Sequence, residues 1–365
     1  MKPSIELSLI TTGFCNLGCK SCPGGRKEDV PSDRPMTVEM LRRIFDKVTK
    51  EAQVLVVRLY YYDEPLLIRD MPKFVALCHE YNLPATISSN LNVFDKYGPA
   101  VLKEAPDTLM ISVSGFTQPV YERSHKGGDI EKVKANMVKV SELRDPKTHV
   151  QVNWHHYRYN EHEEPLMREY ARKLGFSMVS FATSLLPLER ALKVWETGVD
   201  DPKGEDLLIP VKDAREACFE RRQWECDGQN RVLTVNGDGL VTNCNNRIYR
   251  ANLRGSVFDS TVAEILKARK TDSDCVACQA IGGHIYAMQA YTRPVWSPMR
   301  MAGSLARRMG IAGYISPFLQ GVYGRALLPL AKKWTPKIKP QTKTGGNGSA
   351  GCECNQTHDT KTPGA

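Results

Sequence analysis

Short apolar runs alternate with helically periodic segments along the first half of the chain. The runs are rich in β-branched residues and predict strands, whereas segments such as 37–52 and 130–143 repeat apolar residues at the spacing of an amphipathic helix. Successive strand-then-helix units predict a parallel sheet with helices outside it. Six units predict an α/β fold with a partial, TIM-like (β/α)6 barrel. The predicted strands are 5–12, 54–61, 85–88, 108–113, 149–155 and 178–181.

The pattern changes after the sixth predicted strand. Residues 184–225 are rich in Pro, Gly and charged residues and are expected to form a connector. Alternating strands around an Asn-Gly-Asp-Gly turn predict a hairpin over 231–243, and helices are expected at 261–268 and 275–287. These elements indicate a small α+β module. The predicted organisation is a barrel (1–183), a connector (184–225), a module (226–290), a basic amphipathic segment (291–334) and a disordered tail (335–365).

The chain has 365 residues and a formal net charge of +9, and this excess of positive charge comes from its last 75 residues. Residues 291–365 hold eleven Lys/Arg and two Asp/Glu, so the remainder is neutral, and we expect no nucleic-acid partner. Basic and apolar residues without acids over 297–334 favour a peripheral contact with an anionic membrane surface, or packing against the barrel. No stretch of the sequence has the length and apolarity of a transmembrane helix.

Eleven cysteines form an odd set, and the amino terminus lacks the apolar stretch of a secretory signal. A disulfide framework is therefore not expected. Cysteines without an export signal favour metal ligation or redox chemistry in a reducing compartment, so we expect a cytoplasmic protein.

Three cysteines directly follow the first predicted strand. Cys15, Cys19 and Cys22 have the spacing C-x3-C-x2-C, at the end of a β/α barrel where active sites lie. Three thiolates can hold three irons of a cubane cluster and leave the fourth iron open to a small molecule. The alternative is a zinc knuckle with a remote fourth ligand.

With this motif in this place, the sequence resembles the radical S-adenosylmethionine (SAM) superfamily. The resemblance implies a 4Fe-4S cluster whose open iron chelates SAM. It also implies that an electron from the cluster cleaves SAM to a 5′-deoxyadenosyl radical, which abstracts hydrogen from a substrate. A reducing partner such as flavodoxin or ferredoxin would supply that electron.

Segments after later strands add to the resemblance. Residues 62–65 (Tyr-Asp-Glu-Pro) resemble the family's Gly-Gly-Glu-Pro, with Tyr62 and Asp63 in place of the glycines. Residues 88–90 resemble its ribose-contacting segment and 112–115 the element that contacts the SAM carboxylate. Ser21 stands where the family usually has an aromatic residue. The SAM contacts implied by the resemblance are Asp63, Glu64, Ser89, Asn90, Ser112 and His125, with Lys126 as the alternative to His125.

A second set of four cysteines frames the predicted hairpin. Cys226 and Cys244 lie on either side of it, and Cys275 and Cys278 form a C-x2-C pair. Zinc or a fully ligated iron-sulfur cluster would satisfy four thiolates. The arrangement resembles the SPASM and twitch modules of radical SAM enzymes, and four cysteines fit the one-cluster twitch form. That implies a second 4Fe-4S auxiliary cluster, which would accept an electron from a substrate radical, supply electrons to the first cluster, or have a structural role.

Other residues carry weaker predictions. Cys78 is expected in the core, and Cys352 and Cys354 in an exposed tail. Cys218 has no partner at metal spacing, and a role as an acid or a spare ligand is the alternative for it. The candidates for acid-base chemistry near strand ends are Asp63, His155 and Tyr157, together with His156 and Tyr159; the alternative for the two histidines is a buried, hydrogen-bonded pair.

The function that these features predict is a radical SAM oxidoreductase or modifying enzyme. The substrate expected is a sugar, cyclitol or glycan precursor, because the barrel begins by about residue 4 and leaves no room for an amino-terminal peptide-recognition domain. The alternative is a peptide-modifying maturase. The non-enzymatic alternatives are an iron-sulfur electron carrier and a zinc-binding module.

Overall fold

A computed structural model describes residues 2–22, 34–247 and 252–292 of the chain. The predictions for the basic amphipathic segment beyond residue 292 and for the disordered tail, including Cys352 and Cys354, lie outside these ranges. Within them, no helix is both long enough and apolar enough to cross a membrane.

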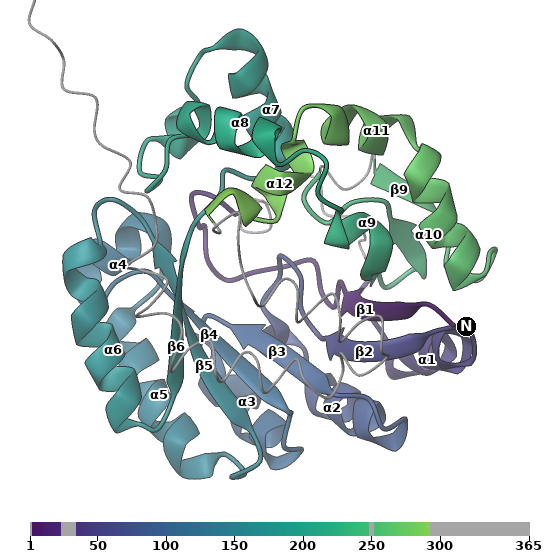
Figure 1. Cartoon of the computed structure of the whole chain (residues 1–365). Helices are drawn as coiled ribbons and strands as arrows, with labels where there is room; N and C mark the ends of the chain where they lie inside the picture. The colour runs from purple at the N-terminus through teal and green to yellow at the C-terminus, as the bar shows by residue number, and fades with distance from the viewer. Residues whose placement is uncertain (1, 23–33, 248–251, 293–365) are drawn as a thin grey trace, which may run out of the picture.

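The first six strands lie side by side in chain order and are all parallel. They form a curved sheet with helices on its outer side, as Figure 1 shows. The predicted partial (β/α)6 barrel is confirmed. Its strands are β1 (Ser4–Leu9), β2 (Gln53–Arg58), β3 (Ala85–Ser89), β4 (Thr108–Val113), β5 (His149–His156) and β6 (Ser177–Ala182).

Amphipathic helices cover the outer face. In α1 the buried residues Leu41, Ile44, Phe45 and Val48 recur at helical spacing, and the Thr37 side chain caps the helix by accepting from the amide of Met40. The covering elements are α1 (Val38–Glu51), η2 (Pro65–Leu67), α2 (Met71–Glu80), α3 (Phe94–Lys103), α4 (Gln118–Ser124), α5 (Ile130–Leu143), η3 (Glu161–Glu163) and α6 (Glu164–Lys173).

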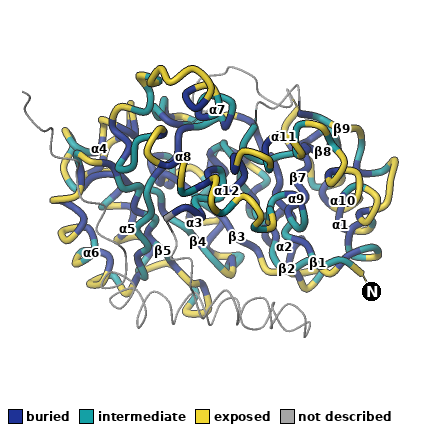
Figure 2. Tube along the Cα trace, turned by 45° about the horizontal axis from the view of Figure 1, so that its top comes forward, coloured by how far each residue is buried: buried dark blue, intermediate teal, exposed yellow. Residues whose placement is uncertain are grey.

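The two faces of each barrel strand differ in burial because successive side chains point to opposite sides. In β4 the outer residues Leu109, Ile111 and Val113 are fully buried under the helices, while Met110 and Ser112 on the inner face are half-buried. Figure 2 shows that buried chain concentrates along the barrel strands, while exposed chain lies mainly on helices and loops. The inner face of the barrel is therefore the half-accessible one.

The hairpin of the second module continues the barrel sheet. Strand β7 (Val232–Val235) pairs in parallel with β1, from Glu6 opposite Val232 to Leu9 opposite Val235. Strands β8 (Leu240–Thr242) and β9 (Leu253–Ser256) follow in antiparallel order. Gly239 closes the predicted turn at a φ of +77°, a conformation that favours glycine.

The stretch expected as a connector contains two helices, α7 (Leu188–Thr197) and α8 (Val211–Glu220), joined through the 3-10 turn η4 (Pro202–Gly204). They pack with α12 (Gly283–Ala287) into a second hydrophobic core that includes Trp195 and Tyr286. The helix predicted over 275–287 is divided, because Gly282 has a φ of +79°. The remaining elements are α9 (Asp227–Arg231), α10 (Val262–Thr271), α11 (Ser273–Ala280) and η6 (Ala290–Thr292).

We expect Leu7→Ala to lower the free energy of unfolding by about 3 kcal/mol, because it leaves a cavity in the core where the fully buried Leu7 side chain was packed. Leu143→Ala removes the same atoms from a residue 51% exposed at the end of α5 and should change stability by less than about 0.5 kcal/mol. Urea unfolding of both variants measures the difference. Equal destabilisation would contradict this packing of β1.

Candidate active site

The first cysteine loop leaves the carboxyl end of β1 and is held against the loop that follows α4. The amide of Gly18 donates to the Lys126 carbonyl at 3.0 Å, and that of Lys20 to the Ser124 carbonyl at 3.3 Å. The Lys20 ammonium also pairs with Asp206 at 3.1 Å, which ties the loop to the segment between α7 and α8. These contacts fix the loop above the ends of the strands.

The three thiols of this loop act on one another electrostatically. Burial raises the pKa of Cys15 to about 12 and that of Cys19 well above its usual range, and the neighbouring thiols add to both shifts. Metal binding at the loop must therefore displace protons. Among the described residues no three Cys, His, Asp or Glu side chains converge on one ion position. A cubane does not require that convergence, because each thiolate binds its own iron.

Asp63 organises the start of the cysteine loop. Its Oδ2 accepts from the amides of Thr11 at 2.9 Å and Thr12 at 2.8 Å, and from the Thr11 hydroxyl at 2.9 Å, while Oδ1 accepts from the Tyr61 amide at 2.9 Å. These donors occupy the carboxylate, and the role of Asp63 as an acid or base stays a prediction. Asp63 is a positioning residue that binds the end of β1 to the loop after β2.

Glu64 links the ends of β2 and β3 to the first cysteine. Its carboxylate accepts from the Ser89 hydroxyl at 2.7 Å and from the amides of Asn90 at 2.9 Å and Leu66 at 3.1 Å. Asn90 Nδ2 in turn donates to Cys15 Sγ at 3.7 Å. Burial raises the pKa of Glu64 to about 7 despite these donors. The predicted residues Glu64, Ser89 and Asn90 thus lie together beside the cysteine loop.

His125 packs below the loop as a neutral ring. It is 3% exposed, shares a 2.5 Å hydrogen bond between Nδ1 and Ser114 Oγ, and stacks on Tyr121 with 4.8 Å between ring centroids. Burial holds its pKa well below the usual range, and His155 lowers it further. A contact of His125 with the SAM carboxylate stays a prediction. Lys126, the alternative, has an exposed side chain.

The two predicted histidines of β5 face opposite sides of the sheet. His155 is half-buried on the inner face, 5.0 Å from the Phe181 ring, and burial lowers its pKa to about 4. His156 lies 3.5 Å from Glu164 on the other side. They are not a mutual pair, because neighbouring residues of a strand point to opposite faces. His155 is the one placed to meet a substrate.

Tyr157 lies under the cysteine loop and is not open to the barrel interior. It is 4% exposed, and its hydroxyl forms 2.9 Å hydrogen bonds with the hydroxyls of Ser21 and Ser124. Tyr159 stacks on its ring, with centroids 5.3 Å apart. Tyr157 therefore supports the loop, and its role as an acid or base stays a prediction.

The inner face next to this loop carries mainly neutral polar groups. Ser88 and Ser112 are 3.4 Å apart, Gln151 donates to Asn153 at 2.7 Å, and register places Asn153 beside Ser112. Glu6 and Arg58 lie deeper and form an ion pair at 2.5 Å. Hydroxyl, amide and imidazole groups thus follow one another across the sheet.

The second set of cysteines comes from three elements. Cys226 caps α9, Cys244 follows β8, and Cys275 and Cys278 lie one turn apart on α11. The four thiols act on one another electrostatically, and burial raises the pKa of each, that of Cys244 to about 12. Cys78, in contrast, is buried in the first hydrophobic core as predicted, and Cys218 is buried in the second.

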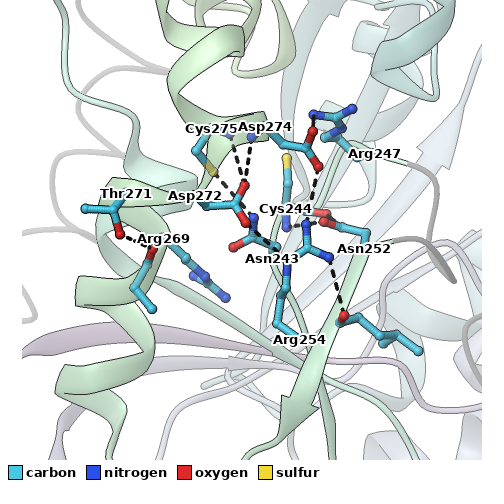
Figure 3. A network of polar contacts seen from close by, with 12 residues as sticks. Asn243, Cys244, Arg247, Asn252, Arg254, Arg269, Thr271, Asp272, Asp274 and Cys275 are labelled. Atoms are coloured by element: carbon cyan, nitrogen blue, oxygen red, sulfur yellow. Dashed lines mark hydrogen bonds and ion pairs between the residues drawn. The ribbon is translucent and has the colours of Figure 1, made fainter.

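Hydrogen bonds to sulfur surround this second set. The Gln229 amide donates to Cys226 Sγ at 3.4 Å, the Asn246 amide to Cys244 Sγ at 3.5 Å, and Asn243 Nδ2 to Cys275 Sγ at 3.6 Å. Figure 3 shows Asn243 between Cys244 and Cys275, with Asn252 beside Cys244. Such donors stabilise thiolates and metal-bound sulfur.

Arg269 places a guanidinium beside these thiols. The residue is 3% exposed and donates to the carbonyls of Val232 at 2.6 Å and Thr242 at 2.8 Å. Burial lowers its pKa, and the thiols of the second set act in the opposite direction. A buried positive charge thus interacts with three of the sulfurs, those of Cys226, Cys244 and Cys275, which metal binding would make negative.

Sequence reasoning missed most of these supporting residues. At the first site Asn16 accepts from Asn90 Nδ2 at 3.0 Å, Tyr121 stacks on His125, and Asn160 accepts from the Tyr157 amide at 2.9 Å. At the second site these residues are Gln229, Asn243, Asn246 and Arg269. The amides in Thr-Asn-Cys-Asn-Asn (242–246) were a usable signal, because they flank a cysteine. Arg269 gave none, since an arginine on a short amphipathic helix is usually solvated.

The three cysteines after the first strand and the polar groups at the next strand ends lie at the end of the barrel where β/α-barrel enzymes have their active sites. Residues 9–174 match the model of the Radical SAM superfamily. The barrel part of the chain is thus similar to a superfamily of enzymes.

Individual relatives are distant. Probable GTP 3′,8-cyclase from Methanococcus maripaludis is 26% identical over 194 residues, which are 52% of this chain and 61% of the relative. The chain thus spans about three fifths of the length of the curated relatives it matches.

Solved structures share the fold. Streptococcus suis SuiB bound to S-adenosylmethionine matches with a TM-score of 0.52 at 12% identity, over 77% of this chain and 72% of SuiB. Native anSMEcpe with bound AdoMet matches with a TM-score of 0.50 at 15% identity, over 77% and 89% of the two chains. At these identities the likeness concerns the fold alone.

We expect Asp63→Asn to lower the free energy of unfolding by about 1 to 3 kcal/mol and to reduce iron retention at the first loop, because an amide nitrogen would face backbone donors. Asp70→Asn is the matched control, since Asp70 is 40% exposed and pairs with Lys73 at the surface. Urea unfolding and iron analysis measure both effects. Equal behaviour of the two variants would refute the positioning role.

Glu64 should make stability depend on pH. Its raised pKa means that between about pH 5 and 7 the folded chain keeps a proton that the unfolded chain has lost, so the free energy of unfolding falls as pH rises, by about 3 kcal/mol in total. Glu64→Gln cannot ionise and should lack this slope, whereas Glu142→Gln on exposed α5 surface should keep it. Parallel profiles for parent and Glu64→Gln in urea unfolding would contradict the shift.

Proposed function

We propose that this chain binds a SAM-cleaving 4Fe-4S cluster through Cys15, Cys19 and Cys22, and a second cluster through Cys226, Cys244, Cys275 and Cys278. The proposed reaction is hydrogen abstraction from a sugar, cyclitol or glycan precursor, with net oxidation or another modification of it. The observation that carries the proposal is that seven of the cysteines form two sets, one of three and one of four, within each of which the thiols lie close enough to interact electrostatically.

The first set fits a cluster with one open iron. Three thiols from one loop leave one corner of a cubane without a protein ligand. When SAM is bound there, the cluster supplies the electron that cleaves it, and the resulting radical abstracts a hydrogen atom. The residues of this chain bind and orient: Ser89 and Asn90, held by Glu64, border the loop, and Ser112 lies on the neighbouring inner face.

The second set fits a fully ligated cluster. Four thiols occupy every corner, so a cluster here would exchange electrons and would not bind SAM. Sulfur-directed hydrogen bonds and the Arg269 guanidinium both favour a reduced, more negative cluster, which supports a role in accepting an electron from the substrate.

The inner face supports a neutral polyhydroxylated substrate. Ser88, Ser112 and Asn153 offer donors and acceptors of the kind that bind hydroxyl groups, and His155 is half-buried and neutral. Arg58 is paired with Glu6 and is less suited to a phosphate group. The alternative substrates are GTP, which appears in the name of the curated relatives, and a peptide, since SuiB was crystallised with a precursor peptide. The experiment below includes both.

The expected partners are the substrate and an electron donor such as flavodoxin or ferredoxin, without nucleic acid. The described parts do not reach the basic residues beyond 292, so peripheral membrane contact and cytoplasmic location are proposals from the sequence.

We expect the parent protein, reconstituted without oxygen, to hold about eight irons with matching sulfide and, with SAM and dithionite, to form 5′-deoxyadenosine. Cys19→Ala should hold about four irons and form none, whereas Cys275→Ala should hold about four and still cleave SAM. Cys78→Ala, outside both sets, should retain both properties. Zinc without sulfide, or SAM cleavage by Cys19→Ala, would refute the proposal.

The same assay addresses the substrate. With perdeuterated glucose, myo-inositol or their amino derivatives, mass spectrometry should detect deuterium in the 5′-deoxyadenosine formed by the parent protein. Deuterium transfer from GTP or from peptides, with none from the cyclitols and sugars, would replace the proposed substrate class.

A further inference from the structure

Tyr62 stands where the family's Gly-Gly-Glu-Pro segment has its first glycine, and Tyr61 directly precedes it. Tyr61 and Tyr62 follow β2, and their rings lie 4.4 Å apart at an angle of 58°. The binding of SAM described above does not use either phenol. Large side chains at this point therefore need another explanation.

On one side, both phenols contact the loop that carries Cys244. The Tyr62 hydroxyl donates to Asn246 Oδ1 at 3.3 Å, and the Tyr61 hydroxyl donates to the carbonyl of Asn245. The amide of Asn246 donates to Cys244 Sγ. Tyr62 thus holds Asn246, and the backbone amide of Asn246 hydrogen-bonds a sulfur of the second set.

On the other side, Tyr62 is joined to the first site. The next residue, Asp63, holds the amides of Thr11 and Thr12 at the start of the first cysteine loop. Burial raises the pKa of the Tyr62 phenol, and the thiols of Cys22 and Cys244 both add to that shift. Tyr62 is thus joined by its hydroxyl to the loop of Cys244 and, through Asp63, to the start of the first cysteine loop.

We propose that Tyr62 is a positioning residue that couples the two cluster sites by fixing Asn246 and, through it, the hydrogen bond to Cys244. This inference rests on the proposed second cluster. Hydrogen bonds to sulfur raise the reduction potential of an iron-sulfur cluster. The potential of the auxiliary cluster accordingly depends on a side chain that the barrel supplies.

The test compares Tyr62→Phe, which keeps the ring and removes the hydroxyl, with Tyr97→Phe on helix α3. In the full-length protein with both clusters, a redox titration followed by EPR should show a lower potential for the auxiliary cluster in Tyr62→Phe and no shift in Tyr97→Phe. In metal-free protein, amide hydrogen exchange of Asn246 should be about tenfold faster in Tyr62→Phe only.

A second variant keeps the test decisive. Asn246→Ala should lower the same potential, and the double variant should shift it no further, because both changes break one path. Unchanged potential and unchanged exchange in Tyr62→Phe would overturn the coupling. If the parent protein holds only the first cluster, the proposed second cluster fails, and the exchange measurement still decides whether Tyr62 fixes Asn246.

Discussion

Strand β1 has a parallel neighbour on each side, and both cysteine sites depend on that pairing. On one edge β2 leads into Asp63 and Glu64, which hold the loop that β1 extends into. On the other edge β7 joins the hairpin that ends at Cys244. Because backbone hydrogen bonds fix both registers, the two sites belong to one rigid sheet and their separation does not depend on a flexible linker.

The barrel was predictable from sequence because its signals are local and repeated. Strand and helix periodicity located all six units, and the cysteine spacing located the first site. Helices α7 and α8 were missed because Pro, Gly and charged residues dilute the apolar positions around Leu188 and Trp195. The parallel pairing of β1 with β7 was also out of reach, since strand pairs distant in sequence leave no local pattern.

For individual side chains, residue type predicted where a residue lies better than it predicted what the residue does there. Asp63, His125 and Tyr157 do lie near the first site, but their polar atoms are occupied by backbone amides or hydroxyls. Sequence identifies groups that can donate, accept or ionise. Whether a group is free for a substrate or already bound to its own fold depends on three-dimensional neighbours.

The β1–β7 pairing also has a consequence for biosynthesis. During translation, β1 and β2 can associate early, but the other edge of β1 lacks its partner until residues 232–235 have been made. Until then an edge strand next to three thiols stays open to other chains and to adventitious metals. That edge closes late in synthesis, and only then can the chain enclose a correct cluster. Iron and sulfide delivered to a nascent chain would therefore arrive before the site that retains them has formed.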